Sequence, residues 1–203
     1  MKKIFILLLC IFSYHASSAE RQPYKAEDRE PCSIYVEDRM PLFGDLHVHT
    51  ALSLDAHTQG TLNTPDDAYR YAKGQSLYLQ PYREDGTSSR ISKLKQPLDF
   101  AAVTDHAELL GEVRLCTDPE SQKYNSLQCK TYRNFPKLSY FYMNAKASMR
   151  KPLGICGENR ENCIDAAQVP WQETIDAAEL HYDRSEACQF STFIGYEWTG
   201  AAY

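Results

Sequence analysis

Two histidines in one short segment are the residues whose type and spacing first suggest chemistry. The segment Gly44 to Thr50 reads GDLHVHT and places His47 and His49 two residues apart. Side chains alternate along an extended strand, so both imidazoles, together with Asp45, are expected to project from one face. Imidazole is the commonest metal ligand among side chains and suits zinc and its neighbours in the transition series. The spacing therefore predicts a metal site carried on a strand.

Two later segments each place ligand-type residues near the end of a predicted strand. Residues 98–104 form an apolar run typical of a strand buried on both faces, and Asp105 and His106 follow it directly. Residues 191–198 are rich in aromatic and β-branched residues, with Glu197 near their end. Active sites of parallel sheets and (β/α) barrels lie at the carboxyl ends of strands. We therefore expect these side chains to meet the histidine pair.

The chain carries four short motifs in a fixed order. They are Asp-x-His-x-His at 45–49, the pair Ser53 and Asp55, Thr-Asp-His at 104–106, and Gly-x-Glu at 195–197. In this order they resemble the motifs of the polymerase and histidinol phosphatase (PHP) superfamily, and residues 49–72 and 99–111 are similar to a secreted branch, the domain of unknown function 3604. The resemblance covers Leu42 to the C-terminus. It implies a distorted (β/α)7 barrel with two or three metal ions that hydrolyses phosphate esters.

The resemblance also implies a role for each site residue. His47 and His49 would hold one divalent ion, Glu197 would bridge it to a second, and Asp55 with His106 would serve another. Glu197 and Asp105 are the candidate catalytic residues, the latter supporting the ligands. The expected cofactors are Zn, Mn or Fe ions, which lower the pKa of a bridging water, so that no protein nucleophile is needed.

Three further residues are compared with ordinary structural roles. His57 matches no ligand position of the family pattern. Glu108, two residues past His106, either faces the mouth of the site or caps a helix in solvent. His181 lies in a predicted helix and is expected on its surface. Glu108 thus remains open as a site residue, and for His57 a structural role is favoured over contact with metal or substrate.

The expected fold class is α/β, the N-terminal portion of a PHP-type barrel that is incomplete in this chain. A complete (β/α) barrel takes about 250 residues, whereas only 184 of 203 remain after the leader. The further His residues and the later Asp-x-His motif of the family are missing. The chain is therefore expected to be the N-terminal part of a longer protein, and to be weakly active or inactive by itself.

The N-terminus predicts export. Residues 1–19 combine Lys2 and Lys3, an apolar run at 4–12 and small residues up to Ala19, the three parts of a secretory signal peptide. The apolar run is too short to span a bilayer. Residues 20–41 read as an extended lead-in, and residues 42–203 as the metallohydrolase domain. A periplasmic or secreted protein without a membrane partner is expected after cleavage.

The cysteine count agrees with an oxidising compartment. Seven cysteines occur, and six remain once Cys10 leaves with the leader, an even number that predicts disulfides. Six cysteines allow 15 pairings, but short loops are the economical choice. The resulting hypothesis is Cys116 with Cys129, Cys156 with Cys163, and Cys32 with Cys188.

The remaining segments predict supporting elements around these strands. Thr64-Pro65 begins a helix that Gly74 ends. Residues 75–96 read as a surface insertion, residues 137–151 as an amphipathic helix, and residues 171–187 as the helix that leads into the last strand.

The charge balance bears on partners and leaves two functions open. The formal net charge is −5 and becomes −7 without Lys2 and Lys3, which disfavours nucleic-acid binding. A small anionic substrate is expected instead. The first function is a metal-dependent hydrolase acting on phosphate esters or on other bonds. The second is an exported, disulfide-stapled module that binds metal or ligand without turnover.

Overall fold

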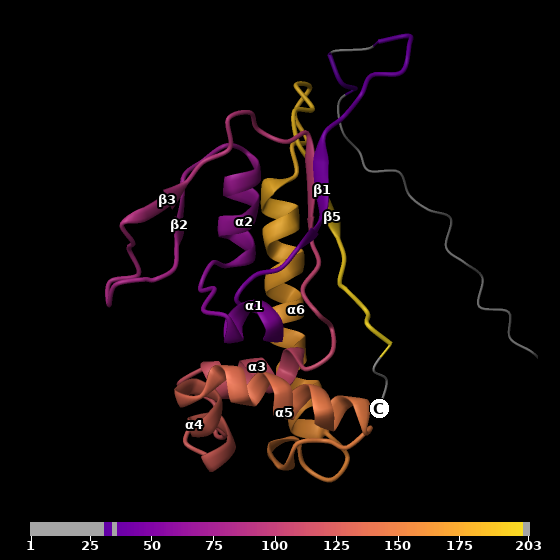
Figure 1. The fold of residues 1–203 in the computed structure, drawn as a ribbon. Coiled ribbons are helices and arrows are strands. Elements are labelled where there is room, and N and C mark those ends of the chain that lie inside the picture. The colour runs from indigo at the N-terminus through magenta and orange to yellow at the C-terminus, as the bar shows by residue number, and fades with distance from the viewer. Residues whose placement is uncertain (1–30, 34–35, 201–203) are drawn as a thin grey trace, which may run out of the picture.

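Three of the predicted strands pair in one parallel sheet. The computed structural model describes residues 31–33 and 36–200, so the predicted signal peptide, residues 1–19, lies outside the described residues. Strand β4 (Phe100–Val103) lies between β1 (Gly44–Val48) and β5 (Ser191–Ile194), and both pairings are parallel. The described residues thus form a mixed α/β fold whose sheet does not close into a barrel (Figure 1).

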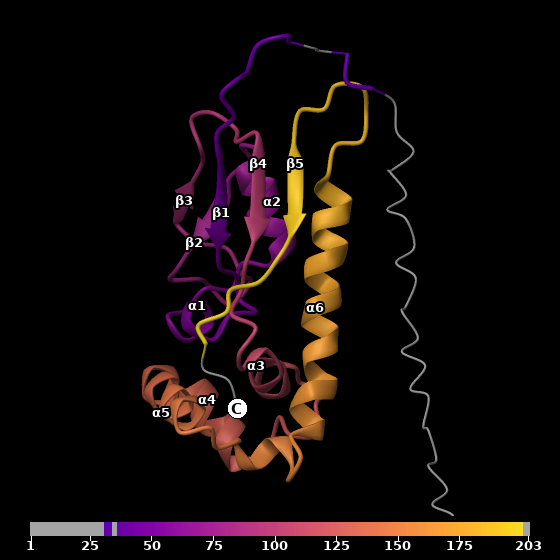
Figure 2. The ribbon, with the colours of Figure 1, turned by 90° about the vertical axis from the view of Figure 1, so that its right-hand side faces the viewer.

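One face of this sheet is covered by helices α2 (Pro65–Ala72) and α6 (Glu161–His181) (Figure 2). The core between the sheet and these helices consists of small aliphatic residues around two aromatic side chains, one from α2 and one from the segment before β5: Tyr69, Ala72, Ala101, Val103, Ala177, Ala178 and Phe190. Tyr69 is fully buried, and its hydroxyl accepts from Val103 N at 3.2 Å and donates to Phe193 O at 3.3 Å. This side chain therefore fastens α2 to two neighbouring strands.

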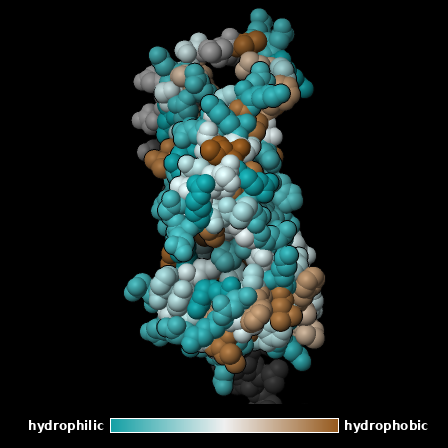
Figure 3. Space-filling view, turned by 60° about the vertical axis from the view of Figure 1, so that its left-hand side comes forward, coloured by the Kyte–Doolittle hydropathy of each residue, from teal (hydrophilic) through white to brown (hydrophobic). Residues whose placement is uncertain are grey.

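A second layer of helices lies beyond the carboxyl ends of the strands (Figure 1). It contains α1 (Leu54–Thr58), α3 (Leu110–Thr117), α4 (Leu127–Asn134), α5 (Pro136–Ser148) and the short 3₁₀ helix η1 (Gly154–Cys156). Hydrophobic residues on the face drawn in Figure 3 gather mainly over this layer, where Leu127 and Leu138 are exposed beside an apolar cavity of about 330 Å³.

The three predicted disulfides are confirmed. They join Cys32 to Cys188, Cys116 to Cys129, and Cys156 to Cys163. The last two link α3 to α4 and η1 to α6 inside the helical layer, where all four cysteines are buried. The first fastens the lead-in to the segment before β5. Three disulfides in a chain of this size are typical of extracellular proteins.

Helix α2 agrees closely with its prediction. Thr64 caps it, with the side chain accepting from Asp67 N while the Asp67 carboxylate accepts from Thr64 N. This reciprocal pair satisfies two backbone donors at the start of the helix. The predicted insertion at 75–96 contains an antiparallel pair, β2 (Leu77–Leu79) with β3 (Arg90–Ser92).

Two predictions about the last helix are wrong. Helix α6 begins at Glu161 rather than near residue 171, and it ends at His181. Pro170 lies inside it, and such a proline ordinarily interrupts a helix, but its ring is fully buried in the core. His181 is not a surface residue, because it is only 8% exposed and its Nε2 lies 2.8 Å from Asp66 of α2.

None of the helices between residues 36 and 200 has the length and apolar character that crossing a membrane requires.

Candidate metal centre

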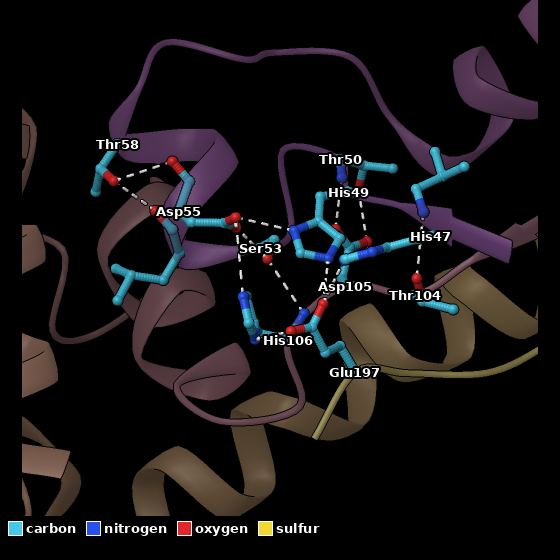
Figure 4. Close-up of polar contacts among 12 residues, drawn as sticks. His47, His49, Thr50, Ser53, Asp55, Thr58, Thr104, Asp105, His106 and Glu197 are labelled. Carbon is cyan, nitrogen blue, oxygen red and sulfur yellow. Dashed lines mark hydrogen bonds and ion pairs between the residues drawn. The ribbon is translucent and has the colours of Figure 1, made fainter. Parts of the chain in front are cut away.

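Two histidines of the β1 segment reach the same carboxylate. His47 Nε2 lies 2.6 Å and His49 Nε2 lies 2.8 Å from Glu197 Oε2. Glu197 follows β5, and a parallel bridge with His106 holds its backbone beside the end of β4. The pairing of β1 with β4 is irregular between Asp45 and Val48, a feature that redirects side chains near binding sites. The sheet thus brings together residues about 150 positions apart in the chain (Figure 4).

The other side of His49 faces a second carboxylate. Its Nδ1 lies 2.9 Å from Asp55 Oδ2, and His106 Nε2 lies 3.8 Å from the same oxygen. Ser53 supports both groups, since its hydroxyl donates to Asp55 Oδ1 at 2.6 Å and accepts from His106 N at 3.1 Å. The remaining nitrogen of His106, Nδ1, lies 3.8 Å from Glu197 Oε1. All five predicted ligands therefore meet in one cluster (Figure 4).

The electrostatics of the cluster favour a cation at its centre. Burial opposes protonation of His49, but the hydrogen bond and charge of Asp55, and then those of Glu197, outweigh burial and raise the pKa of His49. Burial likewise opposes ionisation of Asp55, whose pKa is nevertheless lowered by its hydrogen bonds with Ser53 and His49. Within the described residues, the ion pairs of Asp55 and Glu197 are all with histidines. A divalent ion would replace the proton that these carboxylates attract.

Asp105 lies beside this cluster and points to the loop after β1. It is 5% exposed, and its two oxygens accept from Thr50 N at 2.5 Å and from Thr50 Oγ1 at 2.7 Å. Burial raises its pKa, although both hydrogen bonds from Thr50 act in the opposite direction. Its backbone oxygen accepts from Glu197 N at 3.1 Å. Its contacts therefore position the segments that carry His49 and Glu197, and the catalytic role assigned to it stays a prediction.

Glu108 belongs to the wall of the site. It is 8% exposed, so the alternative of a solvated helix cap is wrong. Its Oε1 accepts from both the backbone nitrogen and the hydroxyl of Thr199, each at 2.8 Å. It borders a cavity of about 290 Å³ that is also lined by Asp55, His106 and Asn144. This cavity adjoins the cluster and is large enough to hold a portion of a small ligand.

Two residues close to the motif take no part in the cluster. His57 Nδ1 lies 2.8 Å from the hydroxyl of Tyr132, and their rings stack with centroids 5.3 Å apart. Burial lowers the pKa of His57. The hydrogen bond and the stacked rings of this pair link α1 to α4. Asp45 accepts from the backbone nitrogen of His47 at 2.9 Å and is exposed. Its contact is with the strand rather than with an imidazole.

Sequence reasoning missed the residues that hold the ligands in place. Thr50 and Thr199 act through contacts with residues 55 and 91 positions away. No local pattern marks such residues, because a threonine in a loop is common. Only the sequence position of Glu108, two residues from His106, gave a signal for this wall of the site.

Comparisons with known proteins give one match. The sequence model of a family described as "Protein of unknown function (DUF3604)" matches residues 36–203. Searches of the curated proteins and of the solved structures give no match. The matched range contains the whole sheet and every residue of the cluster.

Proposed function

The chain belongs to the DUF3604 family of proteins of unknown function, and we propose from its site that it is a metal-dependent hydrolase of the PHP type that acts on phosphate esters. One observation carries the proposal. Three imidazoles and two carboxylates from four separate segments converge at the carboxyl ends of parallel strands: His47, His49, Asp55, His106 and Glu197. Such a donor set suits Zn, Mn and Fe ions alike.

The residues fit a first ion directly. The ligand atoms of His47, His49 and Glu197 all lie within 4.8 Å of one another. If Nε2 of His49 binds the ion, its Nδ1–H donates to Asp55 at 2.9 Å. A carboxylate in this position orients a metal-binding imidazole and raises its basicity. His106 faces Asp55 with one nitrogen and Glu197 with the other, so it can serve a second ion through either.

The proposed chemistry divides between the ions and the chain. When bound, divalent ions lower the pKa of a coordinated water and neutralise charge that develops on phosphoryl oxygens. The chain contributes geometry, because Asp55 fixes the tautomer of His49 and Ser53 holds Asp55 and His106 in register. The side chain of His47 is 72% exposed, which leaves an open approach for substrate. Since Asp55 and Glu108 make the adjoining cavity acidic, an anionic substrate depends on the bound ions for its affinity.

A second candidate function is that of a disulfide-stapled module that binds metal or ligand without hydrolysing a substrate. Three disulfides are typical of extracellular proteins, so we propose that the chain is exported to the periplasm or beyond. The same disulfides would suit a stapled module that binds metal or ligand only. The two candidates therefore differ in a single measurable property, hydrolysis by the metal-loaded protein.

The test is a substrate panel on the full chain loaded with Zn, Mn or Fe(II). The panel contains p-nitrophenyl phosphate, bis-p-nitrophenyl phosphate, p-nitrophenyl acetate and an anilide. His49→Asn removes the central ligand, and His181→Gln is the matched control at a buried histidine outside the cluster. Metal-dependent release of p-nitrophenol from either phosphate ester that disappears only in the His49 variant supports the proposal. Bound metal without turnover favours the binding module, and cleavage of the anilide alone would replace the substrate class.

A further inference from the structure

Glu108 has a buried carboxylate oxygen that makes no hydrogen bond within the described chain. The side chain is 6% exposed, and Thr199 holds its Oε1 with two hydrogen bonds. Its Oε2 is buried and has no hydrogen-bond partner among the described residues. A buried carboxylate oxygen without a partner is destabilising. Such an oxygen is therefore a candidate for binding a cation.

The nearest ligand-type atom belongs to His106. Glu108 Oε2 lies 3.9 Å from His106 Nδ1, and Glu197 Oε1 lies 3.8 Å from the same nitrogen. Both distances are too long for hydrogen bonds. Two atoms that share an ion at about 2.0–2.2 Å from each lie roughly 3–4 Å apart. An ion could therefore lie between His106 Nδ1 and either of these carboxylate oxygens.

The opposite nitrogen of His106 faces a carboxylate that is already engaged. Asp55 Oδ1 accepts from Ser53, and Asp55 Oδ2 lies 2.9 Å from His49 Nδ1. The two oxygens of Glu197 face different partners, since Oε2 faces His47 and His49 while Oε1 faces His106. The donor atoms that remain available are therefore on the Nδ1 side of His106.

We propose that Glu108 is a metal ligand, which binds a second divalent ion through Oε2 together with His106 Nδ1 and Glu197 Oε1. Glu197 then bridges the two ions, and Asp55 orients His49 and His106. Among the described residues, Glu108 belongs to no trio of ligand-type residues whose atoms all lie within 4.8 Å of one another. Binding of the second ion therefore requires the carboxylates of Glu108 and Glu197 to move toward His106. Thr199 holds the far oxygen of Glu108 and lies two residues after Glu197, which ties the two glutamates together. The inference rests on the proposed function for the first ion.

The competing explanation is that Glu108 only anchors Thr199, and Glu108→Gln separates the two. Glutamine keeps an oxygen that accepts from Thr199 N and Oγ1, but it replaces the free anionic oxygen with an amide. Glu112→Gln is the matched control, because Glu112 is a buried glutamate of α3 that lies by Cys156 and Arg160, outside the cluster. Thr199→Ala tests the anchor alone. Each full-length protein is stripped with chelator and titrated with ZnCl₂ by calorimetry, with thermal unfolding of the metal-free form in parallel.

We expect Glu108→Gln to bind one zinc ion fewer, or to bind the second at least about tenfold more weakly, while its metal-free form unfolds at the wild-type temperature or above it, because the substitution removes a buried unpartnered anion. Glu112→Gln and Thr199→Ala are expected to keep both ions. Wild-type stoichiometry and affinity in Glu108→Gln would overturn the inference and leave the first site standing. Loss of the same ion to the same extent in Glu108→Gln and Thr199→Ala would overturn it as well, because the anchor alone would then explain the effect. A wild-type protein that binds no zinc would overturn the inference and the proposed function together.

Discussion

The contact between Thr50 and Asp105 gives a prediction whose size follows from the structure. Both residues are buried, at 1% and 5% exposure, and the Thr50 hydroxyl donates to Asp105 Oδ2 at 2.7 Å. Thr50→Val keeps the shape but removes this donor and leaves a buried carboxylate oxygen unpaired. Hydrogen bonds to charged groups contribute about 1.5–3 kcal/mol. In a domain of this size that corresponds to a fall in Tm of roughly 3–12 °C.

The assay is thermal and urea unfolding of the metal-free protein, with Thr174→Val as the matched control. Thr174 is also buried, but its hydroxyl donates to the backbone oxygen of Pro170 in α6, a neutral bond that contributes about 0.5–1.5 kcal/mol. Thr50→Ser retains the donor and should restore most of the stability. Equal losses in the two valine variants would refute the reasoning that Thr50 holds a buried carboxylate.

Three further predictions concern the metal and the disulfides. Asp55→Asn should weaken zinc binding about 10–100-fold, because the carboxylate that orients His49 is lost; unchanged affinity in calorimetry would contradict this. As the pH is lowered, zinc affinity should begin to fall while the pH is still above 6.5, the ordinary pKa of histidine. The reason is that the pKa of His49 is raised and protons compete with the ion. In the metal-free protein the same shift stabilises the fold below that pH, and this stabilisation is lost as the pH rises through the folded-state pKa; titrations and unfolding at several pH values would show the opposite trends. Replacing Cys32 and Cys188 by serine should lower the free energy of unfolding by about 5 kcal/mol, against about 2–3 kcal/mol for either other pair, since their separation of 156 residues far exceeds 13 and 7; similar losses in urea unfolding would exclude the loop-entropy explanation.

The parts of the site predicted from sequence are those with local rules. The alternation of side chains along residues 45–49 predicted that His47 and His49 face the same way, and the rule that sites lie at the carboxyl ends of parallel strands predicted the places of His106 and Glu197. The helix-capping pattern at Thr64 and Pro65 predicted the start of α2 correctly, because capping depends on residues that are adjacent in the sequence. Two cysteine pairs followed from their short separations of 13 and 7 residues, and the third joined the two cysteines that remained. Except for that third pair, each of these predictions depends on residues close together in the sequence or on a general property of sheets.

The remaining features depend on distant contacts. The start of α6 was misplaced because the burial of Pro170 offsets its local effect on a helix. His181 was expected in solvent, but Asp66 of α2 covers it. The burial of Glu108 depends on Thr199, which is 91 residues away. A single sequence contains no local signal for such contacts, since they arise only when the sheet and both helical layers have assembled.

The central claim is that this cluster binds metal, and elemental analysis of the purified full chain tests it most directly. The wild type, a His47→Ala/His49→Ala variant and the His181→Gln control are compared by the number of Zn, Mn and Fe ions that each chain carries. We predict at least one ion per chain in the wild type and the control, and a lower metal content in the double variant, which lacks the two imidazoles of the first site. A wild type without metal, or a double variant that keeps the same metal content, would contradict the claim.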